Sequence, residues 1–443
     1  MLTGTGTAGA YHAGVLRALD EAGVKIDVVA GRGVGVVAAM FGAIDGGGQL
    51  WGKDGLWCSS SARRLYRLRG SLRVVGVLGI TIAAALLGVL LSPYAFPTYA
   101  LKGTIVLLLC LPLILGIDAG LTVLRRVSKR RARGGLWWRL LGTPIDRIAA
   151  VNLFTNCLWQ VMSGSTNIQK PAHDDFGERY AELLGEHAGQ PGFRELLVMA
   201  HDVDARRDVI FALLDESYLT AYTEPASNTS DRSRLLEIVD LRQTPKRHAM
   251  DALVSALSIP VFTEPHFVRY SAESVWRGET HRLCDRPDGL PRLLEEVARA
   301  GVEQVVIVSA CSPSPGPHAL GADRLDMHGR AGQYLESLES ASLHDAIEGH
   351  AARFQAIFQV RPVHNPLGPF DFKGCYDEQS DRRQTLDELV GRGYEDGCSQ
   401  FVDAVVGESG ELIDALPMDR SSTSPSLSER MAAHEDSSDS TLR

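Results

Sequence analysis

Two glycine-rich turns near the start of the chain have the spacing of sites that hold reactive groups. Residues 4–9, GTGTAG, match the G-x-G-x-x-G pattern, whose glycines let the backbone approach a phosphate at a helix N-terminus. Residues 31–35, GRGVG, match the G-x-S-x-G turn that exposes a catalytic serine, except that Gly33 occupies the serine position. Because glycine has no side chain, this second turn predicts a nucleophile site without its nucleophile.

The first turn taken alone is compatible with dinucleotide binding. Gly4, Gly6 and Gly9 come before a predicted helix whose N-terminus would hold a pyrophosphate. Arg32 closes the second predicted strand, where a cation would suit the 2′-phosphate of NADPH. The acidic residue that usually contacts the ribose is missing at that place. NADPH binding therefore stays an alternative function.

The segments around these turns predict an α/β layout. Residues 1–46 have the pattern strand, glycine turn, helix, strand, glycine turn, helix. Residues 195–203 predict a further buried strand that continues into a helix, and 250–260 predict a helix ending at a proline. Three later segments are strand-like: 266–270, 274–278 and 303–311.

Composition limits the class of protein. The chain has 443 residues and a formal net charge of −9, and its basic residues are bunched, so a general nucleic-acid-binding surface is not expected. Its seven cysteines are scattered without a C-x-x-C pair. That spacing predicts reduced thiols and neither a zinc site nor a disulfide framework.

Two apolar segments predict a transmembrane hairpin. Residues 74–91 contain no charged residue and 104–124 contain one, Asp118, and both have the length of a membrane span. Arginines and lysines cluster before the first segment and after the second, whereas the connecting loop has only Lys102. By the positive-inside rule the expectation is a two-pass membrane protein with all its large soluble segments in the cytoplasm.

The two turns together resemble the N-terminal signature of the patatin-like phospholipase family. The matching stretches are LTGTGTAGAYHAGVLRALDEAG and IDVVAGRGVGVVAAMFGA, and weaker likeness continues at 192–311 and 364–406. The resemblance implies a three-layer α/β sandwich with a central, mostly parallel sheet, and hydrolysis of acyl lipids by a Ser–Asp dyad without metal or cofactor. It assigns the elbow to Gly31, Arg32 and Gly35, and the oxyanion hole to Gly4, Gly6, Thr7, Ala8 and Gly9.

The chain departs from the family pattern at the reacting groups. Gly33 replaces the nucleophilic serine, Thr5 stands at a usual glycine, and Ala8 stands at a usual basic residue. The resemblance places the catalytic aspartate within RGETHRLCDRPDGLP, where Asp285 and Asp288 are the candidates. Acyl chains or membrane lipids are then the expected partners, whether or not the chain is an enzyme.

The expectation is thus a membrane-anchored patatin-like protein whose usual hydrolase chemistry is lost. A residual acyl hydrolase with a different nucleophile, such as Thr5, Thr7 or His12, stays an alternative beside NADPH binding. The expected organisation is a patatin-like segment (1–46), a basic linker (47–73), the hairpin (74–124), a basic or amphipathic connector (125–191), the rest of the patatin-like domain (192–417) and a disordered tail (418–443).

Overall fold

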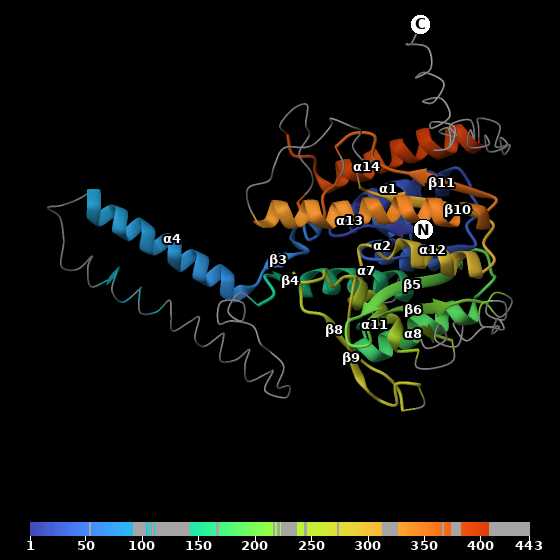
Figure 1. Ribbon diagram of the computed structural model, residues 1–443, viewed down its shortest axis with the longest axis horizontal. Coiled ribbons are helices and arrows are strands. Elements are labelled where there is room, and N and C mark those ends of the chain that lie inside the picture. The colour runs from blue at the N-terminus through green and yellow to red at the C-terminus, as the bar shows by residue number, and fades with distance from the viewer. Residues whose placement is uncertain are drawn as a thin grey trace, which may run out of the picture.

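A nine-stranded mixed sheet forms the centre of the computed structural model (Figure 1). The structure describes residues 1–406 except 53–54, 92–102, most of 105–141, 165–167, most of 216–236, 243–245, 273, 312–326, 366 and 374–381. The strand order is β11 (Ala356–Val360), β10 (Gln304–Ser309), β1 (Leu2–Thr3), β2 (Val28–Gly31), β5 (Glu195–Asp202), β6 (Arg207–Leu213) and β7 (Ile238–Asp240).

The strands from β11 to β5 are all parallel to their neighbours. The short β1 lies in the middle of this set, with Leu2 opposite Val308 on one side and Gly31 on the other. Beyond β5 the sheet becomes mixed, because β6 pairs with β5 in the antiparallel sense. The hairpin of β8 (His266–Arg269) and β9 (Thr280–Cys284) joins the end of β5 through β9.

Side chains of the central strands alternate between two cores. Along β5, Leu196, Val198 and Ala200 belong to one apolar cluster, whereas Leu197 and Met199 belong to the other. This alternation is what a strand covered on both faces requires, because successive side chains point to opposite sides of a sheet. The expected central, mostly parallel sheet of an α/β protein is therefore present.

Two sets of helices supply the rest of these cores. The larger cluster includes residues of α1 (Ala8–Glu21), α2 (Gly35–Ala43), α7 (Ile148–Ser163), α8 (His173–Glu186), α11 (His248–Ala256) and α14 (Leu386–Gly397). The smaller one includes residues of α12 (Leu290–Arg299) and α13 (Met327–His350). After α13 and α14 come the short helices η2 (Ala351–Arg353) and η3 (Cys398–Val406).

The segment between α2 and β5 contributes to the main core. Its described elements include α3 (Gly48–Trp51), η1 (Ala62–Arg64) and the two-stranded sheet of β3 (Arg67–Leu68) and β4 (Ile145–Asp146). Trp57, Phe154 and Tyr180 are each almost completely buried in the large cluster. Buried residues of this segment thus belong to the main core, among them Leu50 and Leu65.

The expected transmembrane hairpin is wrong. Within the described part of the chain, no helix combines the length and apolarity needed to cross a bilayer. This finding also overturns the expected two-pass membrane localisation. Residues 74–91 lie in α4 (Gly70–Leu91), which extends away from the sheet (Figure 1), and most of 104–124 lies outside the described residues. An apolar run predicts a helix, but composition does not decide what that helix packs against.

Three other expectations for local structure differ from the structure or fall outside it. Residues 207–213 form β6 instead of a helix, because a turn at 203–206 sends the chain back alongside β5. In that turn Arg206 has a positive φ of 58°, a left-handed conformation typical of tight turns. The described residues of 274–278 form a turn instead of a strand. The expected tail at 418–443 lies outside the described residues.

Candidate functional site

The elbow turn adopts the conformation that a nucleophile would need. β2 ends at Gly31, and α2 begins at Gly35, so Arg32, Gly33 and Val34 form the strand-to-helix turn. Gly33 has a φ of +56°, in the left-handed region where a side chain is strained. A strained residue at this point is the hallmark of a nucleophile elbow.

The space for a nucleophile at this turn is filled by backbone. A Cβ atom built on Gly33 would lie 2.1 Å from the carbonyl oxygen of Gly4, far inside contact distance. The same Cβ would lie 3.1 Å from Oδ2 of Asp285. The turn therefore places the nucleophile position beside an aspartate, while the Gly4 carbonyl prevents any side chain from occupying it.

The expected oxyanion loop contacts the elbow directly. The Val34 amide, which follows the nucleophile position and would be an oxyanion donor in a working elbow, donates to the Gly4 oxygen at 2.9 Å. The Arg32 amide donates to the Leu2 oxygen at 3.1 Å. An acyl oxygen cannot use the Val34 amide unless the Gly4 carbonyl first moves away.

A later segment of the chain covers the other side of this loop. The Thr7 hydroxyl donates to the backbone oxygen of Asp371 at 2.5 Å. A Cβ on Gly6 would lie 2.8 Å from the Pro369 oxygen. Trp57, from the segment between α2 and β5, also contacts this loop, because a Cβ built on Gly9 would lie 2.3 Å from its ring. The predicted oxyanion residues Gly4, Gly6, Thr7, Ala8 and Gly9 are all buried by the described part of the chain.

Arg32 is the centre of a buried ionic cluster at the elbow. Its guanidinium is fully buried and donates to both carboxylate oxygens of Asp285, from Nε at 3.2 Å and from Nη2 at 2.9 Å. Nη1 donates to Oε1 of Glu339 at 2.8 Å and to the Thr3 hydroxyl at 2.6 Å. The Thr3 hydroxyl in turn donates to Oε1 of Glu339 at 3.0 Å.

This cluster decides the charge state of its members. Burial opposes the charge on Arg32, but Asp285 and Glu339 outweigh it and raise the arginine pKa, so the cation is kept. Burial raises the pKa of Asp285 above its ordinary value, and the attraction of Arg32 acts against that rise. Because Arg32 engages both oxygens of Asp285, this carboxylate is not free to take a proton from a nucleophile.

Of the two aspartate candidates, only Asp285 reaches the elbow. It follows β9 directly, and its amide donates to the Ser258 oxygen at 2.9 Å, which fixes it beside the helix α11 turn. Asp288 instead accepts from Nε and Nη2 of Arg286, both at 3.1 Å. The structure therefore brings Asp285, and not Asp288, next to Gly33 and Arg32.

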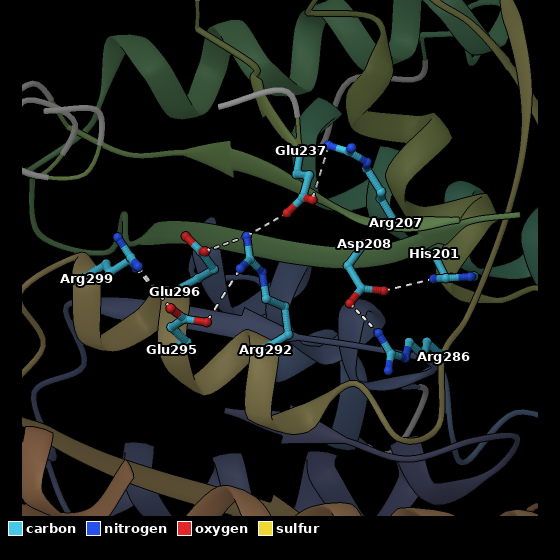
Figure 2. A network of polar contacts seen from close by, with 9 residues as sticks. All are labelled: His201, Arg207, Asp208, Glu237, Arg286, Arg292, Glu295, Glu296 and Arg299. Atoms are coloured by element: carbon cyan, nitrogen blue, oxygen red, sulfur yellow. Dashed lines mark hydrogen bonds and ion pairs between the residues drawn. The ribbon is translucent and has the colours of Figure 1, made fainter. Parts of the chain in front are cut away.

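A polar network fixes the loop that carries Asp285 (Figure 2). Arg286 also reaches Asp208 on β6 at 2.6 Å, and His201 on β5 contacts the same aspartate at 2.9 Å. One helical turn further on, Arg292 pairs with Glu237 and Glu296, both at 2.9 Å. The Arg286–Asp208 contact ties the loop between β9 and α12 to β6, and the Arg292–Glu237 contact ties the first turn of α12 to the residue before β7.

The alternative nucleophiles and the dinucleotide alternative find no support at this site. Burial lowers the pKa of His12 to about 3, and its Nε2 donates to the Thr3 oxygen at 3.0 Å, so it packs as a neutral ring. The Thr7 hydroxyl already donates to the Asp371 oxygen, and Thr5 is buried. Arg32 is fully buried and donates to Asp285, Glu339 and Thr3, so a 2′-phosphate would have to displace these partners.

Sequence reasoning missed Glu339, Thr3 and the covering segment at 367–372. Glu339 lies on α13, in a stretch without any motif, and no sequence signal connects it with Arg32. The sequence patterns indicate for Arg32 only the roles of an elbow residue and a phosphate ligand. A charged residue at the end of a predicted buried strand is a signal from which a buried ion pair could have been expected.

No family model matches the chain, and no curated protein matches it. Among solved structures, the chain is similar to the crystal structure of VipD from Legionella pneumophila. That similarity has a TM-score of 0.32 and 12% sequence identity, and it covers 90% of this chain and 65% of the VipD chain. The chain therefore spans slightly less than two thirds of VipD, and a match at this level adds nothing to the description of the site.

Proposed function

We propose that this chain is a patatin-like protein that keeps the frame of an acyl-hydrolase site but acts without hydrolysis. The observation that carries the proposal is the position of the Gly4 carbonyl oxygen, 2.1 Å from where the Cβ of a residue at position 33 would stand. The Asp285 carboxylate, 3.1 Å from that same point, supports descent from a Ser–Asp dyad.

The proposal accounts for three features together. Without a nucleophile, the attack that would form an acyl-enzyme has no attacking atom. With the Val34 amide already bonded to Gly4, one donor of the oxyanion hole is lost. With Arg32 holding both oxygens of Asp285, the acid of the former dyad has become part of a structural ion pair. Each change would lower hydrolysis by itself.

Activity-based labelling tests this proposal. The purified parent chain, Gly33→Ser and Asp285→Asn are each treated with a fluorophosphonate probe and assayed with short- and long-chain esters. We expect no labelling and no turnover in the parent, and none in Gly33→Ser, because the Gly4 carbonyl blocks the new hydroxyl. Parent turnover that disappears in Asp285→Asn would overturn the proposal.

Acyl lipids are the ligands that we propose for the chain, on the resemblance to the family. Native mass spectrometry of the purified chain with a fatty acid and with a lysophospholipid tests this separately. Retention of either ligand at one per chain supports the assignment. Absence of both, together with absence of hydrolysis, supports a non-hydrolytic protein with a different kind of partner.

A further inference from the structure

Two histidines and an aspartate from three separate elements converge on one point. His173 is the first residue of α8, Asp251 lies in the first turn of α11, and His266 begins β8. Nε2 of His266 lies 2.6 Å from Oδ1 of Asp251, and Nε2 of His173 lies 3.3 Å from the same oxygen. The three ligand atoms all lie within 4.8 Å of one another.

We propose that His173, Asp251 and His266 bind a zinc ion. Two imidazole nitrogens and one carboxylate oxygen are a ligand set that zinc accepts, at bond lengths of about 2.0–2.2 Å. In a tetrahedral site with such bonds, the ligand atoms lie about 3.3 Å apart. The His173–Asp251 distance has this value already, and the His266–Asp251 distance needs to widen by only about 0.7 Å.

A fourth side chain orients the carboxylate for this role. His248 is buried, and its Nδ1 donates to Oδ2 of Asp251 at 2.7 Å. Among the described residues, its buried Nε2 has no hydrogen-bond partner. His248 therefore occupies one carboxylate oxygen and leaves Oδ1 to face both other histidines. An outer partner of this kind is typical of metal-bound carboxylates.

The exposure of the three residues suits an ion that enters from solvent. Their side chains are 37% (His173), 13% (Asp251) and 19% (His266) exposed. The cluster is thus open at its outer side, and three protein ligands leave a fourth position for water. Without an ion, Oδ1 of Asp251 must accept from two imidazoles at once, which requires both rings to carry a proton on Nε2.

The inferred ion would join segments that lie far apart in the sequence. His173 comes from the part of the chain between β2 and β5, whereas Asp251 and His266 lie on either side of the turn at Ser258, whose oxygen holds the Asp285 amide. The proposal is independent of the proposed function, because none of its residues belongs to the Arg32 cluster. Its effect is on the stability of the domain around α8, α11 and β8.

Zinc titration of the full-length chain tests this inference. A preparation without a polyhistidine tag is stripped with a chelator and titrated with zinc chloride by calorimetry, with elemental analysis for stoichiometry. We expect one zinc per chain, a higher melting temperature with zinc, and a tetrahedral visible spectrum with Co²⁺. His173→Ala and His266→Ala should each weaken binding by about tenfold or more.

His344→Ala is the matched control, because His344 also contacts a carboxylate, that of Glu348 at 3.2 Å, but on an exposed helix face. This variant should bind zinc like the parent. Circular dichroism verifies the fold of each variant, and His173→Ala, at an exposed helix start, carries the test if His266→Ala does not fold. The proposal would be overturned if the parent chain did not bind one zinc ion. It would also be overturned if the folded histidine variants bound zinc as tightly as the parent. Tighter binding of Fe²⁺ or Ni²⁺ under the same conditions would overturn the choice of zinc.

Discussion

The carbonyl oxygen of Gly4 stands where the side chain of a nucleophile at Gly33 would begin. The two glycines belong to separate turns, one before α1 and one before α2, and the Val34 amide joins them through a 2.9 Å hydrogen bond. The missing side chain at position 33 is therefore a condition for the contact between the turns, and not only a lost reactive group.

Replacing Gly33 by alanine should destabilise the domain more than loss of a left-handed glycine alone. The φ of +56° costs a side chain about 1–2 kcal/mol. The clash with the Gly4 oxygen adds a packing cost of about 1–3 kcal/mol. Gly23→Ala is the matched control, because Gly23 has a φ of +69° but open space around its Cβ position. Denaturant unfolding of both variants gives the difference, and equal losses would contradict the close contact.

Removing Asp285 should reveal the cost of an unbalanced buried charge. Asp285→Ala leaves the buried Arg32 with Glu339 as its remaining carboxylate, and we expect a loss of about 3–5 kcal/mol in the free energy of unfolding. Glu21→Ala removes a partner from the exposed Arg17–Glu21 pair and should change stability little. Chemical denaturation measures both variants. A small loss for Asp285→Ala would mean that the cluster is open to water.

The close packing between α1 and α14 depends on glycines of both helices, among them Gly14 on α1 and Gly393 on α14. A Cβ on Gly393 would lie 2.1 Å from the Tyr11 oxygen, whereas a Cβ on Gly391, in the same helix, meets nothing within 4 Å. Gly393→Ala should therefore destabilise the domain by about 1–3 kcal/mol. Gly391→Ala should stabilise it by about 0.5–1 kcal/mol, because alanine is the better helix former. Thermal melts of the two variants test the pair, and similar effects would show that the helices lie further apart.

The burial of His12 predicts a pH dependence of stability. The pKa of His12 is about 3 in the folded chain because burial disfavours the charged ring, and an unfolded histidine titrates near 6.5. Between these values the unfolded chain binds a proton that the folded chain does not. The free energy of unfolding should therefore fall as pH is lowered from about 6.5, by up to about 1.4 kcal/mol per pH unit from this group.

His12→Gln isolates this contribution, since glutamine keeps an N–H donor for the Thr3 oxygen but does not titrate. Unfolding curves at several pH values between 7 and 5 should show a shallower acid loss for the variant than for the parent. Parallel curves would mean that His12 titrates normally in the folded chain. The other histidines are the same in the parent and in the variant, so the difference between their pH dependences of unfolding free energy reports the contribution of position 12.

The order of strands and helices around the two glycine turns is predictable from the sequence, whereas the distance between the two turns is not. Apolar runs and glycines in residues 1–46 predict the order of β1, α1, β2 and α2 that the structure contains. The 2.1 Å approach at Gly33 depends on how the turns pack, and a glycine pattern is compatible with both an open and a closed site. Glu339 and the segment at 367–372 reach the turns only through tertiary packing.

The wrong expectations for β6 and for the apolar segments have a related cause, because both features depend on tertiary packing. The segment that forms β6 has the apolar content of a helix or of a buried strand, and its pairing with β5 decides between the two. The expected transmembrane hairpin was inferred from apolar runs and flanking charge, neither of which includes the packing of the surrounding chain. The convergence of His173, Asp251 and His266 has no sequence signature, because their spacing matches no short metal-binding motif.

The position of β1 sets an order of events during folding. This strand pairs with β2 and with β10, and β10 follows it in the sequence by about 300 residues. Until β10 is in place, the edge of β1 that faces β10 has no strand partner. Completing the sheet therefore requires a long-range contact, which is slower to form than pairing between strands close in the sequence.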